Sequence, residues 1–525
     1  MAAAHVEEDR DLIFVNENEY AIGQRKRPRG PNLKAASIAQ NHPNSVTSSK
    51  ATDLEISPDN ALAAKRPPWK PLSFAIAPVL AAPLEDYALA YYSRCYVEVP
   101  HGMPEMVDGH VLQVQFALNN IFFSEPQSVI SLAISAVAHA TFGRAQRSRS
   151  ALATGCTVYH QKYAKALAKT NIALKDASEA TDDRVLLAVM LLSFYENTVM
   201  NQTSQISNRD IRREASRTFV HHDGAMAMLK LRRQRSYCTG SAMELDKLVR
   251  RQLMRSLLLR SMPLPPWLRD GSKYGEHGLA LELDRCMVIV AKLRHQASNL
   301  CAGSTCLSRS DEHDQKSQCQ CLLGEAQALD AALVMWEESM AVEDRFRICT
   351  IQNNGRLENC NRIYNGTVHI YPTVGHAGMW NRYRAFRLAV SDTMLKALSI
   401  LAGYPGSEVR LLKEAVKSRS ECLADDFCAS VPYMLGLLES YQMTGLDATI
   451  TTKDLASSKI TVTASTAAFL CWPLTMVIML SGLSMRHQRY LRDRLLEVSE
   501  IVDDGLLERI ANGVPPSSYD SENIP

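Results

Sequence analysis

The feature that most constrains this chain is the spacing of its apolar residues, which recur at intervals of three and four from about residue 72 to about residue 512. That spacing is typical of helices with one buried face. After Thr181, which we expect to be a helix cap, residues 182–200 are apolar around most of the circumference and predict a central helix. Strand-like alternation is nearly absent, and 366–373 is the one short candidate. The sequence therefore predicts an all-α fold, a large irregular helical bundle.

Size and charge narrow the possible roles of the protein. With 525 residues, 46% of them hydrophobic, the chain can bury one large core or a few ordinary ones. Lys and Arg total 58 against 56 Asp and Glu, so the net charge of +2 provides no whole-molecule field for nucleic acid or anionic lipid. The most hydrophobic window, 465–483, contains Pro473 and precedes a charged run. We expect a buried core helix there and no membrane span.

Thirteen cysteines are scattered through the chain, mostly singly, which is typical of a reducing compartment. The N-terminus is acidic and has no apolar stretch of signal-peptide length. The polar stretch 300–321, which we expect to be a loop, gathers five possible metal ligands: Cys301, Cys306, His313, Cys319 and Cys321. A structural zinc site needs two close pairs of ligands, and the single residue between Cys319 and Cys321 disfavours binding to one ion. We expect no metal site and no cofactor in this chain.

Asp182 and Asp183 are similar to the paired aspartates that bind magnesium diphosphate in all-α terpene cyclases. Such a site needs a third carboxylate one turn further on. Leu186 and Leu187 stand at that place. We therefore expect the two aspartates to cap a helix and to interact with its dipole.

His221, His222 and Asp223 are the other candidates for acid–base chemistry. Adjacent residues on a helix point about 100° apart, so the two imidazoles do not face one site easily. No nucleophile elbow, zinc-protease motif, phosphate loop or dinucleotide fingerprint is found in the sequence. The sequence therefore favours a protein that is not an enzyme.

Two amphipathic segments, 208–235 and 247–260, are rich in arginine. The excess of basic residues in the first would suit contacts with phosphates. Because Asp210, Glu214 and Asp223 lie within one or two turns of these arginines, we expect a solvated or ion-paired helix face instead.

The N-terminal region, 1–70, is rich in Ser, Asn and Pro and is expected to be a disordered linker. It carries one basic patch, consisting of Arg25, Lys26, Arg27, Arg29 and Lys34. Such a patch is typical of a nuclear import signal or of a tether that contacts phosphates, and a solubilising linker is the alternative. We expect residues 72–512 to form one helical domain and 513–525 to form a second disordered tail.

Several segments together resemble the fungal-specific transcription factor domain, a helical region that follows the zinc binuclear cluster in fungal regulators. Within 218–235, His221, Gly224 and Ala225 are similar to its His-x-x-Gly-Ala motif. The stretch 364–390 resembles its tyrosine- and histidine-containing strand with the Trp-Asn-x-x-Arg helix that follows. Residues 83–97 are similar to its first helix, and 467–482 to its late Trp-Pro-Leu helix.

The resemblance implies a nuclear regulator of RNA polymerase II transcription whose helical domain binds transcriptional co-regulators, with a homodimer as a further possibility. In that family a zinc cluster held by six cysteines comes before the domain, and 12–34 resembles the linker that follows the cluster. The first cysteine here is Cys95, inside the helical region, so no zinc ligand is assigned to this chain. We expect the DNA-binding finger to be absent or omitted from the gene model, with zinc present only if an upstream cluster exists.

Without that finger, the basic patch alone would contact DNA weakly, because reading base edges requires a rigid element in the groove. The alternatives are a helical protein-interaction scaffold unrelated to transcription and an all-α enzyme of terpene-cyclase type.

Overall fold

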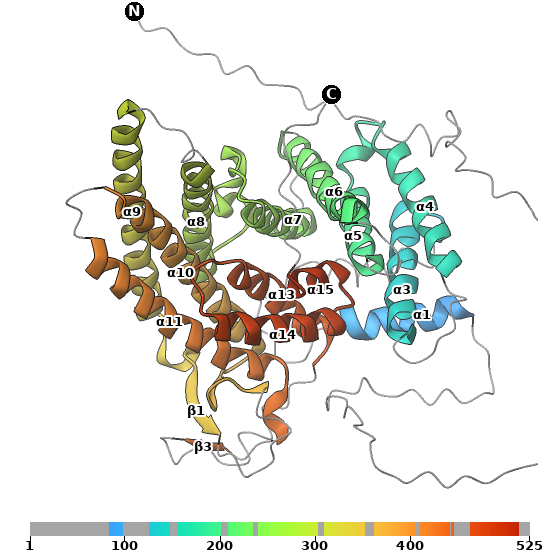
Figure 1. Cartoon of the computed structure of the whole chain (residues 1–525). Coiled ribbons are helices and arrows are strands. Elements are labelled where there is room, and N and C mark those ends of the chain that lie inside the picture. Colours follow the sequence, from blue (N-terminus) through green and yellow to red (C-terminus); the bar gives the residue numbers. More distant parts are fainter. Residues whose placement is uncertain are drawn as a thin grey trace, which may run out of the picture. The chain divides into compact units, whose positions relative to one another are not determined.

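The computed structural model describes residues 83–97, 125–147, 156–200, 208–234, 240–302, 309–351, 362–404, 409–440, 443–445 and 462–513. The chain divides into two units, Met1–Ile76 and Ala77–Pro525, and every described residue belongs to the second. The described residues form thirteen α-helices and three short strands, which confirms the all-α prediction (Figure 1). The linker predicted at 1–70, with its basic patch, and almost all of the tail predicted at 513–525 lie outside the described residues.

The first helices pack around α5 (Asp183–Val199), in which most residues are buried, as predicted for a central helix. Helices α3 (Val129–Arg147), α4 (Cys156–Ala173) and α6 (Asn208–Gln234) contact α5. Helix α1 (Leu84–Tyr92) packs on α3. A π-helical turn, η2 (Ser93–Val97), continues α1.

The start of α5 differs by one residue from the prediction. Its N-cap is Asp182, whose side chain accepts a hydrogen bond from the amide of Arg184 at 2.7 Å. Thr181 belongs to the preceding 3-10 turn, η5 (Glu179–Thr181), where its hydroxyl donates to the carbonyl of Ser178. The prediction of Thr181 as the cap is therefore wrong, because its hydroxyl is used within the turn.

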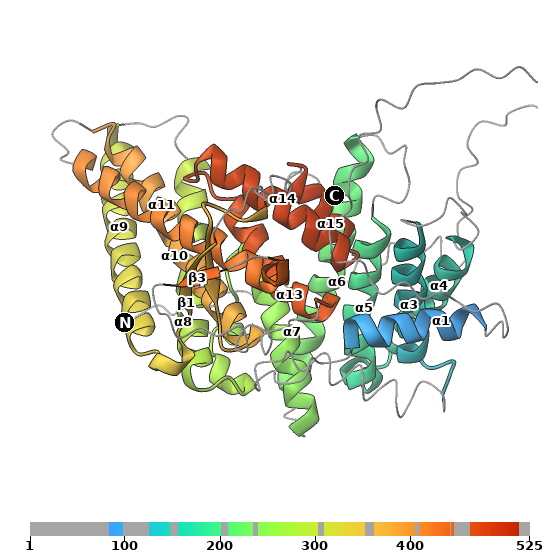
Figure 2. The ribbon, with the colours of Figure 1, turned by 90° about the horizontal axis from the view of Figure 1, so that it is seen from below.

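The later helices pack around α10 (Val374–Leu401), in which Trp380, Tyr383 and most other residues are buried. Four helices contact it: α8 (Gly278–Ala302), α9 (Arg309–Glu338), α11 (Val409–Met434) and α13 (Ala464–Ile478). Helix α7 (Gly240–Leu259) contacts both groups, touching α5, α6 and α8 (Figure 2). Short 3-10 turns occur at Pro266–Leu268, Gly271–Tyr274, Val342–Asp344 and Leu437–Ser440.

Helix α13 contains most of the hydrophobic window 465–483. Leu470, Leu474 and Met476 are completely buried, which confirms the prediction of a core helix. Pro473 lies inside the helix. No helix in the described part of the chain is both long enough and apolar enough to cross a membrane.

A small antiparallel sheet has the strand order β2-β1-β3. Strand β2 (Thr367–Ile370) lies within the predicted stretch 366–373 and pairs with β1 (Arg347–Ile351). Strand β3 (Met443–Gly445) pairs with the other edge of β1. The sequence analysis missed β1 and β3, because strands of five and three residues are too short to establish an alternating pattern.

The stretch 300–321, expected to be a loop, is mostly helical. Helix α8 continues to Ala302 and α9 begins at Arg309. Gln, Lys and Glu are polar but favour helices, so the polarity of this stretch reflects exposure and not a loop. On the inner side of α9, Cys319 is completely buried.

The last two described helices return to the first group. Helix α14 (Met485–Ile501) packs on α13, and α15 (Gly505–Ala511) packs on α14, α5 and α13. As Figures 1 and 2 show, α15 consequently lies beside helices from the beginning of the domain.

Candidate functional site

The candidate metal ligands of 301–321 are not brought together. Cys301 and Cys321 are exposed, while Cys319 is buried, which raises the pKa of its thiol. Cys306 lies outside the described residues. Within the described ranges, no three His, Cys, Asp or Glu residues form a group able to hold a metal ion.

The paired aspartates form ion pairs with arginines. Asp182 caps α5 and lies 3.2 Å from Nε of Arg184. An Oδ1 atom of Asp183 lies 2.6 Å from the guanidinium of Arg232, which also contacts Asp246 at 2.7 Å. Since the Arg232 side chain is only 6% exposed, these bonds tie α5, α6 and α7 together inside the protein. The structure therefore places the aspartates in a helix cap and in a packing contact.

His222 lies between two serines. Its Nε2 is 3.3 Å from the hydroxyl of Ser193 on α5, and its Nδ1 is 3.1 Å from that of Ser256 on α7. Burial lowers the pKa of His222 to about 3 and that of His221 to about 4, so both imidazoles are neutral at physiological pH. Asp223 lies 2.9 Å from the guanidinium of Arg260. These side chains join α6 to α5 and α7.

Four arginines of the two arginine-rich segments form ion pairs, while the side chains of 208–218 lie outside the described residues. The pairs are Arg232–Asp246, Arg250–Asp284, Arg251–Glu276 and Arg260–Asp223. All four arginine side chains are buried or nearly buried, with 0 to 13% exposure. They therefore stabilise contacts between helices and do not form the solvated face that the sequence also allowed.

The segment 364–390, which carries part of the family resemblance, folds around Arg384 of α10, whose side chain is 2% exposed. Its guanidinium donates to the hydroxyl of Tyr371 at 2.5 Å and to Nδ1 of His369 at 3.1 Å. The carbon of the guanidinium lies 4.6 Å from the ring centre of Phe346 and 5.5 Å from that of Trp380. A buried cation is thus held by hydrogen bonds and by aromatic faces.

Through His369, the guanidinium of Arg384 is linked to a carboxylate on α11. Because Nδ1 accepts from Arg384, the imidazole proton is on Nε2, which lies 3.7 Å from Oδ1 of Asp426 on α11. Burial, with Arg384 nearby, lowers the pKa of His369 to about 2 and keeps it neutral. This network ties β2 to α10 and α11.

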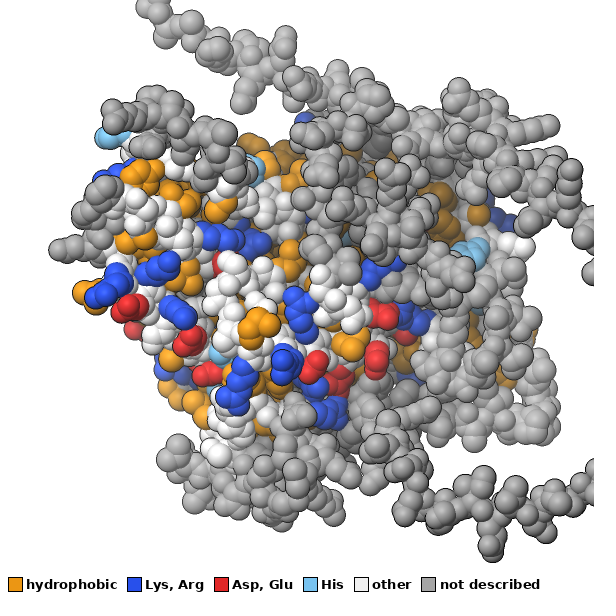
Figure 3. Space-filling view, viewed as in Figure 1, with side chains coloured by type: hydrophobic (Ala, Val, Ile, Leu, Met, Phe, Trp, Pro, Cys, Tyr) orange, Lys and Arg blue, Asp and Glu red, His pale blue; other side chains and the backbone are white. Residues whose placement is uncertain are grey.

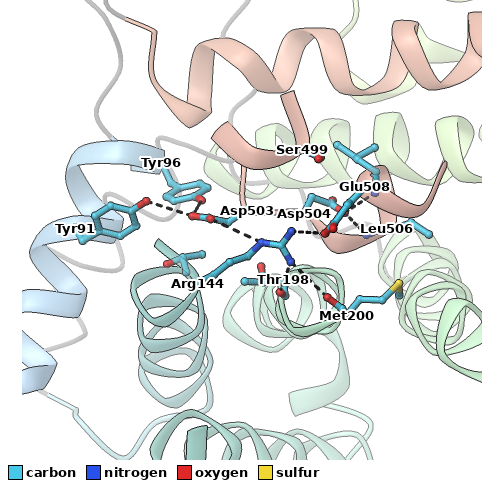
Figure 4. Close-up of polar contacts among 12 residues, drawn as sticks. Tyr91, Tyr96, Arg144, Thr198, Met200, Ser499, Asp503, Asp504, Leu506 and Glu508 are labelled. Carbon is cyan, nitrogen blue, oxygen red and sulfur yellow. Dashed lines mark hydrogen bonds and ion pairs between the residues drawn. The ribbon is translucent and has the colours of Figure 1, made fainter. Parts of the chain in front are cut away.

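A buried carboxylate cluster lies at the turn between α14 and α15, centred on Asp503 (Figure 4). Asp503 has a φ of 53°, the left-handed region that favours glycine. The amide of Asp504 donates to the carbonyl of Ser499 at 3.0 Å, which completes a Schellman turn at the end of α14. A side chain at this position costs about 1 to 2 kcal/mol of backbone strain. Asp503 nevertheless occupies it and is only 4% exposed.

Two tyrosines donate to the same carboxylate oxygen of Asp503. The hydroxyl of Tyr96 lies 2.7 Å from Oδ2, and that of Tyr91 lies 3.2 Å from it. Tyr96 belongs to the π-helical turn η2, in which residues five apart lie on the same side. The irregular end of α1 therefore points both hydroxyls at Asp503, as Figure 4 shows.

Arg144 of α3 connects this carboxylate to the end of α5. It contacts Glu508 of α15 at 2.8 Å and donates to the carbonyls of Thr198 and Met200 at 3.2 and 3.4 Å. Its Nε is 3.9 Å from Oδ1 of Asp503, too far for a hydrogen bond. The guanidinium of Arg144 is therefore shared among several acceptors, and of these Asp503 lies farthest from it.

Burial raises the pKa of Asp503 to about 7, although hydrogen bonding from Tyr96 and the charge of Arg144 act in the opposite direction. Burial also raises the pKa of Asp504, which caps α15 by accepting from the amides of Leu506 and Leu507. At neutral pH the cluster can therefore gain or lose a proton, and it joins α1, α3, α5, α14 and α15.

Sequence reasoning missed this cluster. The local signal, Asp503 and Asp504 before Gly505, indicates a break between two helices. It does not indicate burial, because the partners of Asp503 lie 407 and 412 residues away in the sequence.

No family model, curated protein or solved structure matches this chain.

Proposed function

We propose that this chain is a regulator of RNA polymerase II transcription that acts in the nucleus through its helical domain. The domain would bind transcriptional co-regulators or a second copy of itself. The carrying observation is that two segments of the resemblance, 364–390 and 467–482, contact one another inside the protein. His369 of β2 bonds to Arg384 of α10, and Trp472 of α13 packs against Phe386 of α10 with ring centres 5.5 Å apart.

The environments of the candidate catalytic residues support a role in binding and control. The aspartates at the start of α5 and the histidine pair of α6 are engaged in caps, ion pairs and packing contacts. The alternative of an enzyme of terpene-cyclase type would need these aspartates to face a metal cluster.

Surface charge bears on DNA binding. On the face shown in Figure 3, basic and acidic side chains are interspersed. On α14, for example, exposed Arg486 and Arg489 are followed by exposed Asp493. We therefore assign contact with phosphates to the basic patch of the N-terminal region, where it would be weak and sensitive to salt.

The basic patch gives the first test. In the full-length tagged protein, replacing Arg25, Lys26, Arg27 and Arg29 with Ala should abolish nuclear accumulation, because an import signal needs clustered positive charge. Replacing Lys65 and Arg66, which lie in the same region, is the matched control and should leave accumulation unchanged. The measurement is the ratio of nuclear to cytoplasmic fluorescence.

A second measurement addresses transcription itself. The full-length chain, fused to an unrelated DNA-binding domain, should change transcript levels from a reporter that carries the matching sites. No change in either direction, together with nuclear exclusion that the patch variant does not affect, would favour a scaffold unrelated to transcription.

A further inference from the structure

We propose that the Asp503 cluster is a proton-operated latch between the first and last helices of the domain. The turn between α14 and α15 holds α1, η2 and α3 firmly when Asp503 carries a proton and loosens when its carboxylate is ionised. This inference goes beyond the proposed function and does not depend on it.

The geometry explains why an ionised Asp503 is poorly stabilised. Its side chain is buried, and Arg144, the cation that contacts it, lies closer to Glu508 than to Asp503. Another nitrogen of the Arg144 guanidinium donates to two carbonyl groups at the end of α5. Among the described residues, two tyrosine hydroxyls donate to Asp503 at hydrogen-bonding distance. A buried carboxylate with so little compensation favours its protonated form.

The carboxyl groups around the cluster, those of Glu500, Asp504 and Glu508, add to its acidic character. Groups from every surrounding element face the cluster. The acidic ones are Glu500 of α14, Asp504 of the turn and Glu508 of α15, and the basic ones are Arg144 of α3 and Arg255 of α7, which lies near Cys471 of α13. The remaining groups are Tyr91, Cys95 and Tyr96 of α1 and η2, and the uncharged Asn197 of α5. Glu500 and Glu508 interact with each other, and the pKa of Glu500 is raised by burial and by Glu508. Ionisation of Asp503 therefore adds a further negative charge to an acidic cluster.

The turn between α14 and α15 is also packed closely against the end of α5. An added Cβ on Gly505 would lie 2.3 Å from the carbonyl oxygen of Met200, and Asn197 donates to Asp504 at 3.2 Å. Because this contact is close, a change at Asp503 cannot be absorbed by a small shift toward α5. We expect the turn to separate from η2 and α3 instead.

The direction of the pH effect follows from linkage. In the closed state the turn contacts η2 and α3, and in the released state it has separated from them. The pKa of Asp503 is about 7 in the closed state and has the ordinary value of 3.8 in the released state, so between pH 3.8 and pH 7 the closed state binds more protons. The closed latch is therefore most stable at low pH, loses stability as the pH rises through this range, and changes little above it. For these two values, the equilibrium constant for opening should rise about tenfold between pH 6 and pH 8.

Hydrogen–deuterium exchange of the full-length protein tests this. After correction for the pH dependence of chemical exchange, the amides of 84–97 and 499–511 should lose about tenfold in protection between pH 6 and pH 8. In the variant Asp503→Asn this loss of protection with rising pH should disappear, because Asn does not ionise. Asn still provides an acceptor for Tyr96 and tolerates the left-handed backbone. The matched control is Asp493→Asn, an exposed aspartate of α14, which should behave like the wild type.

Tyr96→Phe separates titration from simple packing. It keeps the ring but removes a hydrogen bond that favours the ionised form of Asp503, so the midpoint of the pH dependence should move to higher pH. The latch is refuted if wild-type protection does not change between pH 6 and pH 8. It is equally refuted if Asp503→Asn and Asp493→Asn show the same pH dependence, or if Tyr96→Phe moves the midpoint to lower pH.

Discussion

Single residues in this domain differ sharply in how closely they are packed, and two helical glycines show the extremes. An added Cβ on Gly505 would lie 2.3 Å from a backbone oxygen of Met200, whereas one on Gly224 of α6 would meet nothing within 4 Å. Backbone atoms cannot turn aside as a flexible side chain can. At Gly505, therefore, the turn and the end of α5 are too close together to admit a side chain.

We predict opposite effects of the same substitution at these two positions. Gly505→Ala should lower the free energy of unfolding by about 1 to 3 kcal/mol, because of the overpacked contact. Gly224→Ala should raise it by about 0.5 to 1 kcal/mol, because alanine loses less conformational entropy in a helix. Urea denaturation of the two variants and the wild type provides the measurement. Equal effects at both positions would contradict this account.

The buried guanidinium of Arg384 gives a second prediction. Arg384→Met keeps much of the side-chain volume but removes the donor to Nδ1 of His369 and one of the donors to the hydroxyl of Tyr371. We expect a loss of about 2 to 3 kcal/mol in the free energy of unfolding, the typical cost of buried polar groups left unpaired. Arg410→Met, at an exposed position of α11, should change it by less than about 0.5 kcal/mol. An equally mild effect of Arg384→Met would show that the network contributes little.

At the scale of elements, most helices follow from apolar periodicity alone. The central helix α5 was predicted because it is apolar around most of its circumference, and the core helix α13 because it contains the most hydrophobic window of the chain. The first half of α9 was missed, since its long polar side chains were taken to indicate a loop although they suit an exposed helix. The sequence analysis also could not find β1 or β3, because the pairing that makes them strands depends on residues far away in the chain.

The cap of α5 allows a prediction at this scale. Asp182→Ala should cost about 1 kcal/mol of stability through loss of the hydrogen bond to the first turn. If the aspartates serve only as cap and ion pair, millimolar magnesium should not change the thermal midpoint of the wild type. A magnesium-dependent rise in that midpoint, abolished by Asp182→Ala with Asp183→Ala, would instead support the all-α enzyme.

The candidate site shows what remains hidden from the sequence. Tyr91 and Tyr96 sit on a recognisable amphipathic helix, and Asp503 sits in a recognisable helix break. Nothing local indicates that they meet, because the contact arises from the packing of α15 on α5 and from the π-helical turn that aligns the two tyrosines. Its elements could therefore be predicted separately, but their proximity could not.

For the whole molecule, the return of the last helices to the first has a consequence for synthesis. Tyr96 and Asp503 are 407 residues apart, so at about 5 to 20 residues per second a ribosome needs roughly 20 to 80 s to make the second after the first. Throughout that time Tyr91 and Tyr96 lack Asp503 as an acceptor, although their aromatic neighbours Phe142 and Phe194 are made early. Each new molecule therefore makes its first helices well before the turn that contacts them, and the hydrogen bonds to Asp503 can form only after translation has passed that residue.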